Sequence, residues 1–274
     1  MTPKTVLITG CSTGLGRAIA ETAIAAGHRV IATARDIRSI TDLEREGTCR
    51  VAMLDVTDLA NVREVITEAG PLDVLINNAG YGLIGAVEEC SDDQIRRNIE
   101  TNFFGPLNII RAALPTFRAQ GSGHIINISA AASISNYPGF GIYGGAKAAL
   151  ELMSESLRLE LAPLGIKVTL VQPGPFRTDF ITRGLEHAEQ HIPEYDSTSG
   201  KFAKLLATMN GKQTGAPARA AKVILAVVDS DAPPLRLVLG KYANDKSRRR
   251  ATDAEKERAT WEHISQPTDF TSAS

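Results

Sequence analysis

The sequence predicts a single α/β domain built around a doubly wound sheet of seven parallel strands. Short apolar runs rich in β-branched residues alternate with longer segments of helical periodicity, a pattern typical of a parallel sheet covered on both faces. With 274 residues and 43% hydrophobic side chains, the chain is long enough to bury one large core. We therefore expect strands over residues 5–9, 29–33, 51–54, 74–77, 124–129, 167–172 and 235–239.

Helical segments are expected to connect these strands. The first helix should begin near Gly14, because Leu15 and Ile19 recur at helical spacing, and it should stop at Gly27. Two longer helices are expected over residues 92–119 and 143–161.

Two regions depart from this alternation. Residues 179–215 mix glycine, proline and scattered apolar positions, and a segment this long and irregular is typical of a functional lid. We expect a domain over residues 1–240 that includes this lid, followed by a C-terminal helical extension over residues 241–274. The extension is charged but carries Trp261 and Ile264, so we interpret it as a solvated helix docked by its tryptophan.

Charge and cysteine content bear on the class of function. The chain has 30 Lys and Arg and 31 Asp and Glu, and this balance offers no overall field for nucleic acid or a membrane surface. A basic patch at residues 246–250 leaves nucleic-acid binding as the alternative. The 3 cysteines form no disulfide or zinc pattern, and no apolar stretch approaches the ~20 residues that span a bilayer. We expect a soluble cytoplasmic protein with reduced thiols and a small-molecule substrate.

A glycine-rich segment follows the first expected strand. Its spacing, Gly10-x-x-x-Gly14-x-Gly16, leads directly into the first expected helix. Glycines let the backbone approach a pyrophosphate, whose charge is then met by amide groups at the helix N-terminus. The segment therefore predicts a dinucleotide-binding turn, with a spacing that differs from the commonest dinucleotide fingerprint.

Three further motifs occur in order along the chain, Asn77-Asn78-Ala79-Gly80, Tyr143-x-x-x-Lys147 and Pro173-Gly174. Together with the glycine-rich turn, they resemble the short-chain dehydrogenase/reductase family over residues 4–240. The resemblance implies a Rossmann-like fold, a nicotinamide cofactor and no metal. It also implies a homo-oligomer, a dimer or tetramer assembled through the two long helices.

The resemblance further implies which residues hold the cofactor. Asp55 and Val56 would contact the adenine, although Asp55 is also explained as a turn residue at a strand end. Phe176 through its backbone and Thr178 through its hydroxyl would hold the carboxamide. The full implied set is Gly10, Ser12, Thr13, Gly14, Leu15, Gly16, Arg35, Asp55, Val56, Asn78, Ala79, Gly80, Tyr143, Lys147, Pro173, Gly174, Phe176 and Thr178, with Asn78, Ala79 and Gly80 lining the ribose.

The end of the second strand favours NADP(H) over NAD(H). A carboxylate at this point would accept a hydrogen bond from the ribose 2′-hydroxyl and repel a 2′-phosphate. Ala34 stands there instead, followed by Arg35, whose guanidinium can bind the phosphate through two charged hydrogen bonds. An exposed arginine with no ligand is the alternative. Thr13 takes the place of a second basic residue found in some relatives, so strict exclusion of NAD(H) is not expected.

Hydride reduction of a ketone leaves an alkoxide, so the site needs an acid aimed at that oxygen. By resemblance, Tyr143 is the acid and Lys147 lies one helical turn away, where its charge would lower the phenol pKa. Asn102 matches the asparagine that holds a water in the family's proton relay; a helix-interior residue bonded to its own backbone is the alternative.

The family's catalytic serine is replaced in this chain. Counting back from Tyr143, its position holds Ala130, whereas the neighbouring Ser129 would point to the opposite face of the strand. Ser133 would reach the site only if the following loop turned back. Losing one such donor typically slows turnover by about 100- to 1000-fold, so we expect an impaired catalyst that still binds cofactor. A deliberate Ser-to-Ala substitution is the explanation we favour; a natural enzyme with a substitute donor, or a non-catalytic NADP(H)-binding regulator, are the others.

The expected pocket points to a bulky hydrophobic or aromatic ketone or secondary alcohol. It would be closed by the lid and by the mostly apolar side chains of Tyr81, Tyr137, Phe140 and Phe176.

His187 and His191 stand four residues apart within the lid, a spacing that can bind zinc. No third ligand is apparent, so we expect a solvated lid helix at this point instead.

Overall fold

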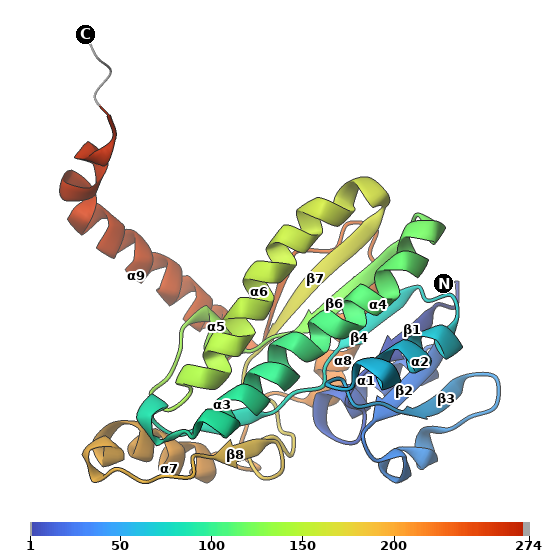
Figure 1. Cartoon of the computed structure of the whole chain (residues 1–274), viewed down its shortest axis with the longest axis horizontal. Coiled ribbons are helices and arrows are strands. Elements are labelled where there is room, and N and C mark those ends of the chain that lie inside the picture. The colour runs from blue at the N-terminus through green and yellow to red at the C-terminus, as the bar shows by residue number, and fades with distance from the viewer. Residues whose placement is uncertain (1, 271–274) are drawn as a thin grey trace.

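The computed structural model describes residues 2–270 and contains the predicted seven-stranded parallel sheet (Figure 1). The strand order is β3-β2-β1-β4-β6-β7-β9. The strands are β1 (Thr5–Ile8), β2 (Arg29–Ala34), β3 (Cys49–Met53), β4 (Val74–Asn77), β6 (Gly123–Ile128), β7 (Ile166–Pro173) and β9 (Arg236–Leu239). The prediction of one Rossmann-like α/β domain is confirmed, with each expected strand present within about two residues.

Helices cover both faces of this sheet. Side chains alternate along a strand, so Val6 and Ile8 pack into the core beneath α1 (Gly14–Ala25) and α8 (Pro217–Val228). Leu7 lies in the opposite core, beneath α2 (Leu59–Ala69), α4 (Gly105–Gln120) and α6 (Gly141–Leu161). These two cores fix the carboxyl ends of the strands along one edge, where ligands bind in open α/β sheets.

The expected helix over residues 92–119 is interrupted. It consists of α3 (Asp92–Ile99), a single π-helical stretch over Glu100–Phe104, and α4. A π-helical turn widens the helix and redirects side chains, and such turns are frequent at functional sites. The interruption contains Asn102, which was predicted as a site residue.

The lid segment, residues 179–215, is more ordered than its composition suggested. It holds β8 (Leu185–His187), which pairs in parallel with β5 (Gly82–Ile84) in a second, two-stranded sheet, and α7 (Lys201–Thr208). The prediction of a solvated helix carrying both lid histidines is wrong, because His187 lies in β8 and His191 lies outside any helix, bonded to Asp196. Backbone pairing with β5 holds this part of the lid extended.

The C-terminal extension forms α9 (Lys241–Ser265), which projects from the body of the domain (Figure 1). The interpretation that Trp261 docks this helix is wrong, because Trp261 is 62% exposed. Contacts to the body come instead from its first turns, where Ala243 is fully buried. Residues 271–274 of the expected extension lie outside the described residues.

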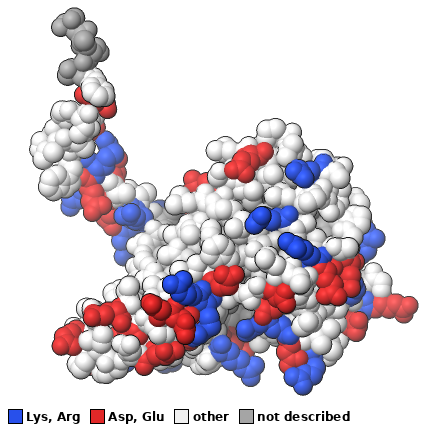
Figure 2. Space-filling view, in the orientation of Figure 1, with Lys and Arg blue, Asp and Glu red and all other residues white. Residues whose placement is uncertain are grey.

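The visible surface carries basic and acidic side chains interspersed, as the balanced charge of the chain predicts (Figure 2). Cys11, Cys49 and Cys90 are free and buried. Between residues 2 and 270, no helix combines the length and apolar character that a membrane crossing requires.

Candidate functional site

A cavity of about 1430 Å³ opens at the carboxyl ends of the parallel strands. It extends from the turn between β1 and α1, past the ends of β2, β4, β6 and β7, to the lid. The sequence-predicted residues that line it are Gly10, Ser12, Thr13, Gly14, Leu15, Arg35, Asp55, Val56, Asn78, Ala79, Gly80, Tyr81, Ala130, Tyr137, Phe140, Tyr143, Lys147, Pro173, Gly174, Phe176 and Thr178. Gly16 and Asn102 are not part of this lining; Gly16 packs beneath the turn and Asn102 is fully buried.

The glycine-rich turn is shaped by close backbone packing against the end of β4. Gly10 has φ +72°, and a Cβ at this position would lie 2.9 Å from the Cα of Ala79. A Cβ on Gly16 would collide with the Asn78 side chain. The Asn78 amide donates to the backbone oxygens of Thr9 (2.9 Å) and Gly10 (3.0 Å), so it ties the turn to β4. The turn therefore leaves a side-chain-free cradle that a pyrophosphate fits.

At the end of β2, Arg35 and Asp36 both line the cavity. The Asp36 carboxylate accepts hydrogen bonds from the Arg38 guanidinium, both at 2.9 Å, and this contact lowers the pKa of Asp36. Asp36 was missed in the sequence analysis, although its place directly after Arg35 was a usable signal. Because the positive charge of Arg38 neutralises Asp36, Asp36 repels an anion bound near Arg35 less strongly.

Asp55 serves as a turn residue at the wall of the cavity. Its Oδ1 accepts from the backbone N–H (2.9 Å) and the hydroxyl (2.7 Å) of Thr57. Asp55 is therefore the turn residue that the alternative predicted, and it also lines the cavity. Its contact with an adenine stays a prediction.

Tyr143 and Lys147 lie one turn apart near the start of α6 and both are buried. The Lys147 ammonium donates to the backbone oxygen of Ile128 at 3.0 Å. Burial lowers the pKa of Lys147 to about 8, and the negative charge of Glu151 opposes that shift. Burial also raises the pKa of Tyr143, so the expected net lowering by Lys147 is wrong for this structure. Desolvation of the phenolate is the cause of this shift, and it keeps Tyr143 protonated near neutral pH.

Asn102 presents an unused acceptor next to this pair. Its amide donates to the backbone oxygens of Tyr81 (2.9 Å) and Asn98 (3.0 Å), while its Oδ1 is buried and has no partner within residues 2–270. A Cβ built on Gly80 would lie 2.5 Å from that oxygen and 3.2 Å from the Lys147 Nζ. The two polar atoms therefore flank the same small space, which suits a bridging water.

Position 130 offers only a methyl group to the cavity. Ala130 packs in one small apolar cluster with Tyr143 and Phe140. The Ser129 hydroxyl instead donates to Glu151 Oε1 at 2.6 Å. The Ser133 hydroxyl lies against the same carboxylate oxygen. Neither neighbouring serine is directed at the place that a side chain at position 130 occupies.

Aromatic side chains line the lid end of the cavity. The Tyr137 ring stacks on the Phe202 ring of α7, with ring centroids 5.0 Å apart. The Nζ of Lys246, on α9, lies over the Tyr137 ring, 3.2 Å from its centroid. The Tyr137 hydroxyl contacts that of Tyr242 at 2.8 Å. Phe180 and Phe202 come from the lid, which was expected to close this pocket, although neither residue was singled out. Tyr242 was missed because it comes from the extension, for which no place at the cavity was predicted.

Across the described part of the chain, no group of three or more His, Cys, Asp or Glu is arranged to hold a metal ion.

Comparisons with known proteins agree with this architecture. The family described as short chain dehydrogenase matches residues 4–189. The crystal structure of a short-chain dehydrogenase from Streptomyces avermitilis is 40% identical, with a TM-score of 0.91 over 98% of this chain and 99% of that one. A 3-ketodihydrosphingosine reductase from Bacteroides thetaiotaomicron is 36% identical, covering 88% of this chain and 89% of its own.

A short chain dehydrogenase from Burkholderia cenocepacia, crystallised in complex with NADP, is 26% identical, with a TM-score of 0.75 over 94% of this chain and 97% of that one. The family match covers more than half of the chain, and the Streptomyces avermitilis relative shares its fold over 98% of the chain. The chain therefore belongs to the short-chain dehydrogenase family of oxidoreductases.

Proposed function

We propose that this chain is an NADP(H)-dependent oxidoreductase that interconverts a bulky hydrophobic or aromatic ketone and its secondary alcohol. The observation that carries the proposal is the common cavity, in which Tyr143 and Lys147 face a glycine cradle suited to a dinucleotide. A screen of NADPH oxidation over bulky and small ketones tests it. Turnover of bulky ketones in preference to small ones is the expected result, and the reverse preference contradicts the substrate class.

The proposed chemistry assigns one task to each residue. NADPH supplies the hydride that adds to the carbonyl carbon. Tyr143 donates its proton to the carbonyl oxygen, and its raised pKa keeps the phenol protonated near neutral pH before hydride transfer. The Lys147 ammonium stabilises negative charge on the phenol oxygen once the proton has left. Asn102 holds a water through its unpaired Oδ1, and that water returns a proton to Tyr143 by way of Lys147.

Ala130 would leave the developing alkoxide without one hydrogen-bond donor, so the proposed enzyme is an impaired one. The neighbouring serines give little support to a substitute donor, because both hydroxyls are engaged with Glu151. This same observation favours a second candidate function, an NADP(H)-binding regulator without turnover. The two functions differ in whether any carbonyl is reduced while NADPH is bound.

Two observations support NADP(H) over NAD(H). Arg35 lines the cavity at the end of β2, and the Burkholderia cenocepacia relative binds NADP. Charged hydrogen bonds from a guanidinium to a phosphate contribute about 1.5–3 kcal/mol. Replacing Arg35 with alanine is therefore expected to weaken NADPH binding by about 10- to 100-fold and to leave NADH binding nearly unchanged.

Fluorescence titration of both cofactors measures this effect. Arg29→Ala is the matched control, because Arg29 is exposed at the opposite end of β2 and does not line the cavity. Equal loss of NADPH affinity in the two variants, or equal loss of NADPH and NADH affinity in Arg35→Ala, would show that Arg35 does not select the phosphate.

The apolar lid end of the cavity supports a bulky substrate. Aromatic surface there comes from Phe140, Tyr143, Phe180 and Phe202. The Tyr137 ring contacts both Phe202 and Lys246. A lysine over an aromatic face contributes about 1–2 kcal/mol when it is desolvated, which would hold this wall in place. The relative named 3-ketodihydrosphingosine reductase is consistent with a ketone as the reacting group.

We further propose a homo-oligomer assembled through α4 and α6. On α6, Leu152 is 68% exposed and Leu159 is 76% exposed, and their spacing of seven residues places them on one face. Exposed apolar side chains that share a face are typical of an interface. We expect analytical ultracentrifugation to find a dimer or tetramer, and Leu159→Glu to shift it towards monomer. A monomeric parent protein contradicts the proposal.

A further inference from the structure

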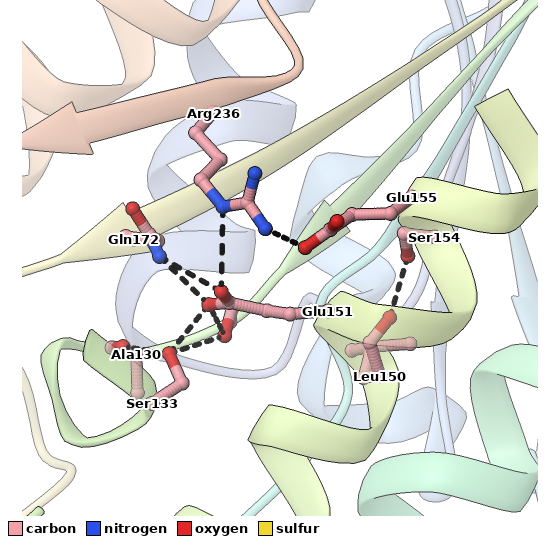
Figure 3. Close-up of polar contacts among 9 residues, drawn as sticks. Ala130, Ser133, Leu150, Glu151, Ser154, Glu155, Gln172 and Arg236 are labelled. Carbon is pink, nitrogen blue, oxygen red and sulfur yellow. Dashed lines mark hydrogen bonds and ion pairs between the residues drawn. The ribbon is translucent and has the colours of Figure 1, made fainter. Parts of the chain in front are cut away.

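A buried carboxylate lies beside the proposed catalytic residues and has no role in the chemistry described above. Glu151 follows Lys147 by one turn on α6 and is only 7% exposed. Its carboxylate accepts hydrogen bonds from the Ser129 hydroxyl (2.6 Å), from the Ser133 hydroxyl, and from the Gln172 amide at 2.9 Å to each oxygen (Figure 3). A buried carboxylate with this many donors is held in one geometry.

These donors come from three different segments around position 130. Ser129 directly follows β6, Ser133 lies in the short helix α5 (Ala131–Ile134), and Gln172 lies near the end of β7, just before Pro173 and Gly174. Ala130 lies between Ser129 and Ser133 in the chain, so Glu151 contacts the turn that carries Ala130 on both sides of that residue. Each hydroxyl has a single proton. The Ser129 hydroxyl is directed at Glu151, and the Ser133 hydroxyl has both Glu151 and the backbone oxygen of Ala130 as acceptors. Neither serine can then donate to a substrate oxygen without leaving these partners.

Charge connects the same carboxylate to Lys147. Arg236 of β9 approaches Glu151 Oε2 at 3.8 Å but also pairs with Glu155, and its side chain is 39% exposed. The charged and polar groups around Glu151 are Lys147 and Glu155, one turn before and one turn after it on α6, Arg236 on β9, and the neutral Ser129, Ser133 and Gln172. Of the two cations, Lys147 is the buried one, and burial lowers its pKa while the charge of Glu151 raises it.

We propose that Glu151 is a positioning residue of the active site, which fastens the turn bearing Ala130 and supplies the negative charge opposite the Lys147 ammonium. This inference rests on the proposed function, because it matters for catalysis only if Tyr143 and Lys147 are catalytic. Burial lowers the pKa of Lys147 to about 8, and the Glu151 charge is what opposes that shift. Removing this charge must move the loss of the Lys147 proton to a lower pH.

The test compares Glu151→Gln with Glu155→Gln in the full-length protein. Glu155 is the matched control, because it lies one turn further along α6 and also contacts Arg236, but its side chain is 38% exposed. NMR of lysine labelled with ¹³C at Cε, assigned with a Lys147→Arg variant, measures the titration midpoint of Lys147. We expect this midpoint to fall by about one pH unit in Glu151→Gln and to stay unchanged in Glu155→Gln.

Amide hydrogen exchange over residues 129–133 measures how firmly the turn is fastened, and it should quicken at least about tenfold in Glu151→Gln alone. An unchanged Lys147 midpoint overturns the proposal even if exchange quickens, because Glu151 would then be merely structural. Glu151→Asp keeps the charge on a shorter side chain, so its Lys147 midpoint should stay near that of the parent while exchange quickens. If Glu151→Gln does not fold, the test rests on Glu151→Asp. Unchanged amide exchange over residues 129–133 in Glu151→Asp then overturns the proposal.

Neither measurement uses a carbonyl substrate. A failure of the proposed function would appear as NADPH binding without turnover, with the Lys147 titration and the amide exchange still measurable. The two failures are therefore distinguishable.

Discussion

Replacing Ala130 with serine is expected to raise kcat for ketone reduction by about 100- to 1000-fold, the typical value of one preorganised donor to a developing oxyanion. Ala130 lines the cavity and packs in the same apolar cluster as Tyr143, so a hydroxyl at this position is introduced next to the proposed acid. The measurement is NADPH oxidation with a panel of bulky ketones, together with NADPH affinity for each variant. Affinity should stay the same, because the new hydroxyl addresses the substrate oxygen.

Ala132→Ser is the matched control. Ala132 is also buried, belongs to the same cluster and lines the same cavity, so this variant adds the same hydroxyl two residues away. Equal and substantial rates in the parent and Ala130→Ser would contradict the prediction and mean that another group already supplies the donor. If neither the parent nor Ala130→Ser oxidises NADPH while both bind it, the result favours the NADP(H)-binding regulator over the enzyme.

Replacing Tyr143 with phenylalanine in the Ala130→Ser background is expected to lower kcat by about 100- to 10,000-fold, the usual contribution of a positioned acid. The change removes the only atom that donates the proton and keeps the ring, which packs against Phe140 at 5.3 Å between centroids. Because the pocket keeps its aromatic wall, KM should change much less than kcat. Steady-state kinetics in the reductive direction separates the two parameters.

Tyr195→Phe serves as the control for this tyrosine substitution. Tyr195 lies in the lid with its hydroxyl bonded to Glu88, and it is not among the residues that line the cavity. A loss in Tyr195→Phe as large as in Tyr143→Phe would mean that the effect comes from lid packing and not from proton donation.

Much of the candidate site was predictable because it depends on short-range pattern. Gly10 and Gly14 sit between a buried strand and a helix, and Tyr143 and Lys147 are one helical turn apart, so sequence spacing alone brings their backbones into place. Strand ends of a parallel sheet meet at one edge, which explains why residues from β1, β2, β4, β6 and β7 share the cavity.

The incorrect predictions concern residues whose partners are distant in sequence. His187 is four residues from His191, a helical spacing, yet backbone pairing with β5 holds it in a strand. Trp261 suggested docking by its size, but α9 leaves the body after its first turns. The direction of the Tyr143 pKa depends on how completely the surrounding chain excludes water, which no motif encodes.

The sequence by itself therefore determined the sheet, the glycine-rich turn and the identity of the residues at the proposed catalytic positions, including the methyl group of Ala130. Periodicity and strand-to-helix turns are local properties, and local properties can be counted along a chain. Only the tertiary structure decided that Glu151 engages Ser129 and Ser133, and that Tyr137 lies between Phe202 and Lys246. Those contacts join segments up to 109 residues apart, and packing of whole elements, not spacing, brings them together.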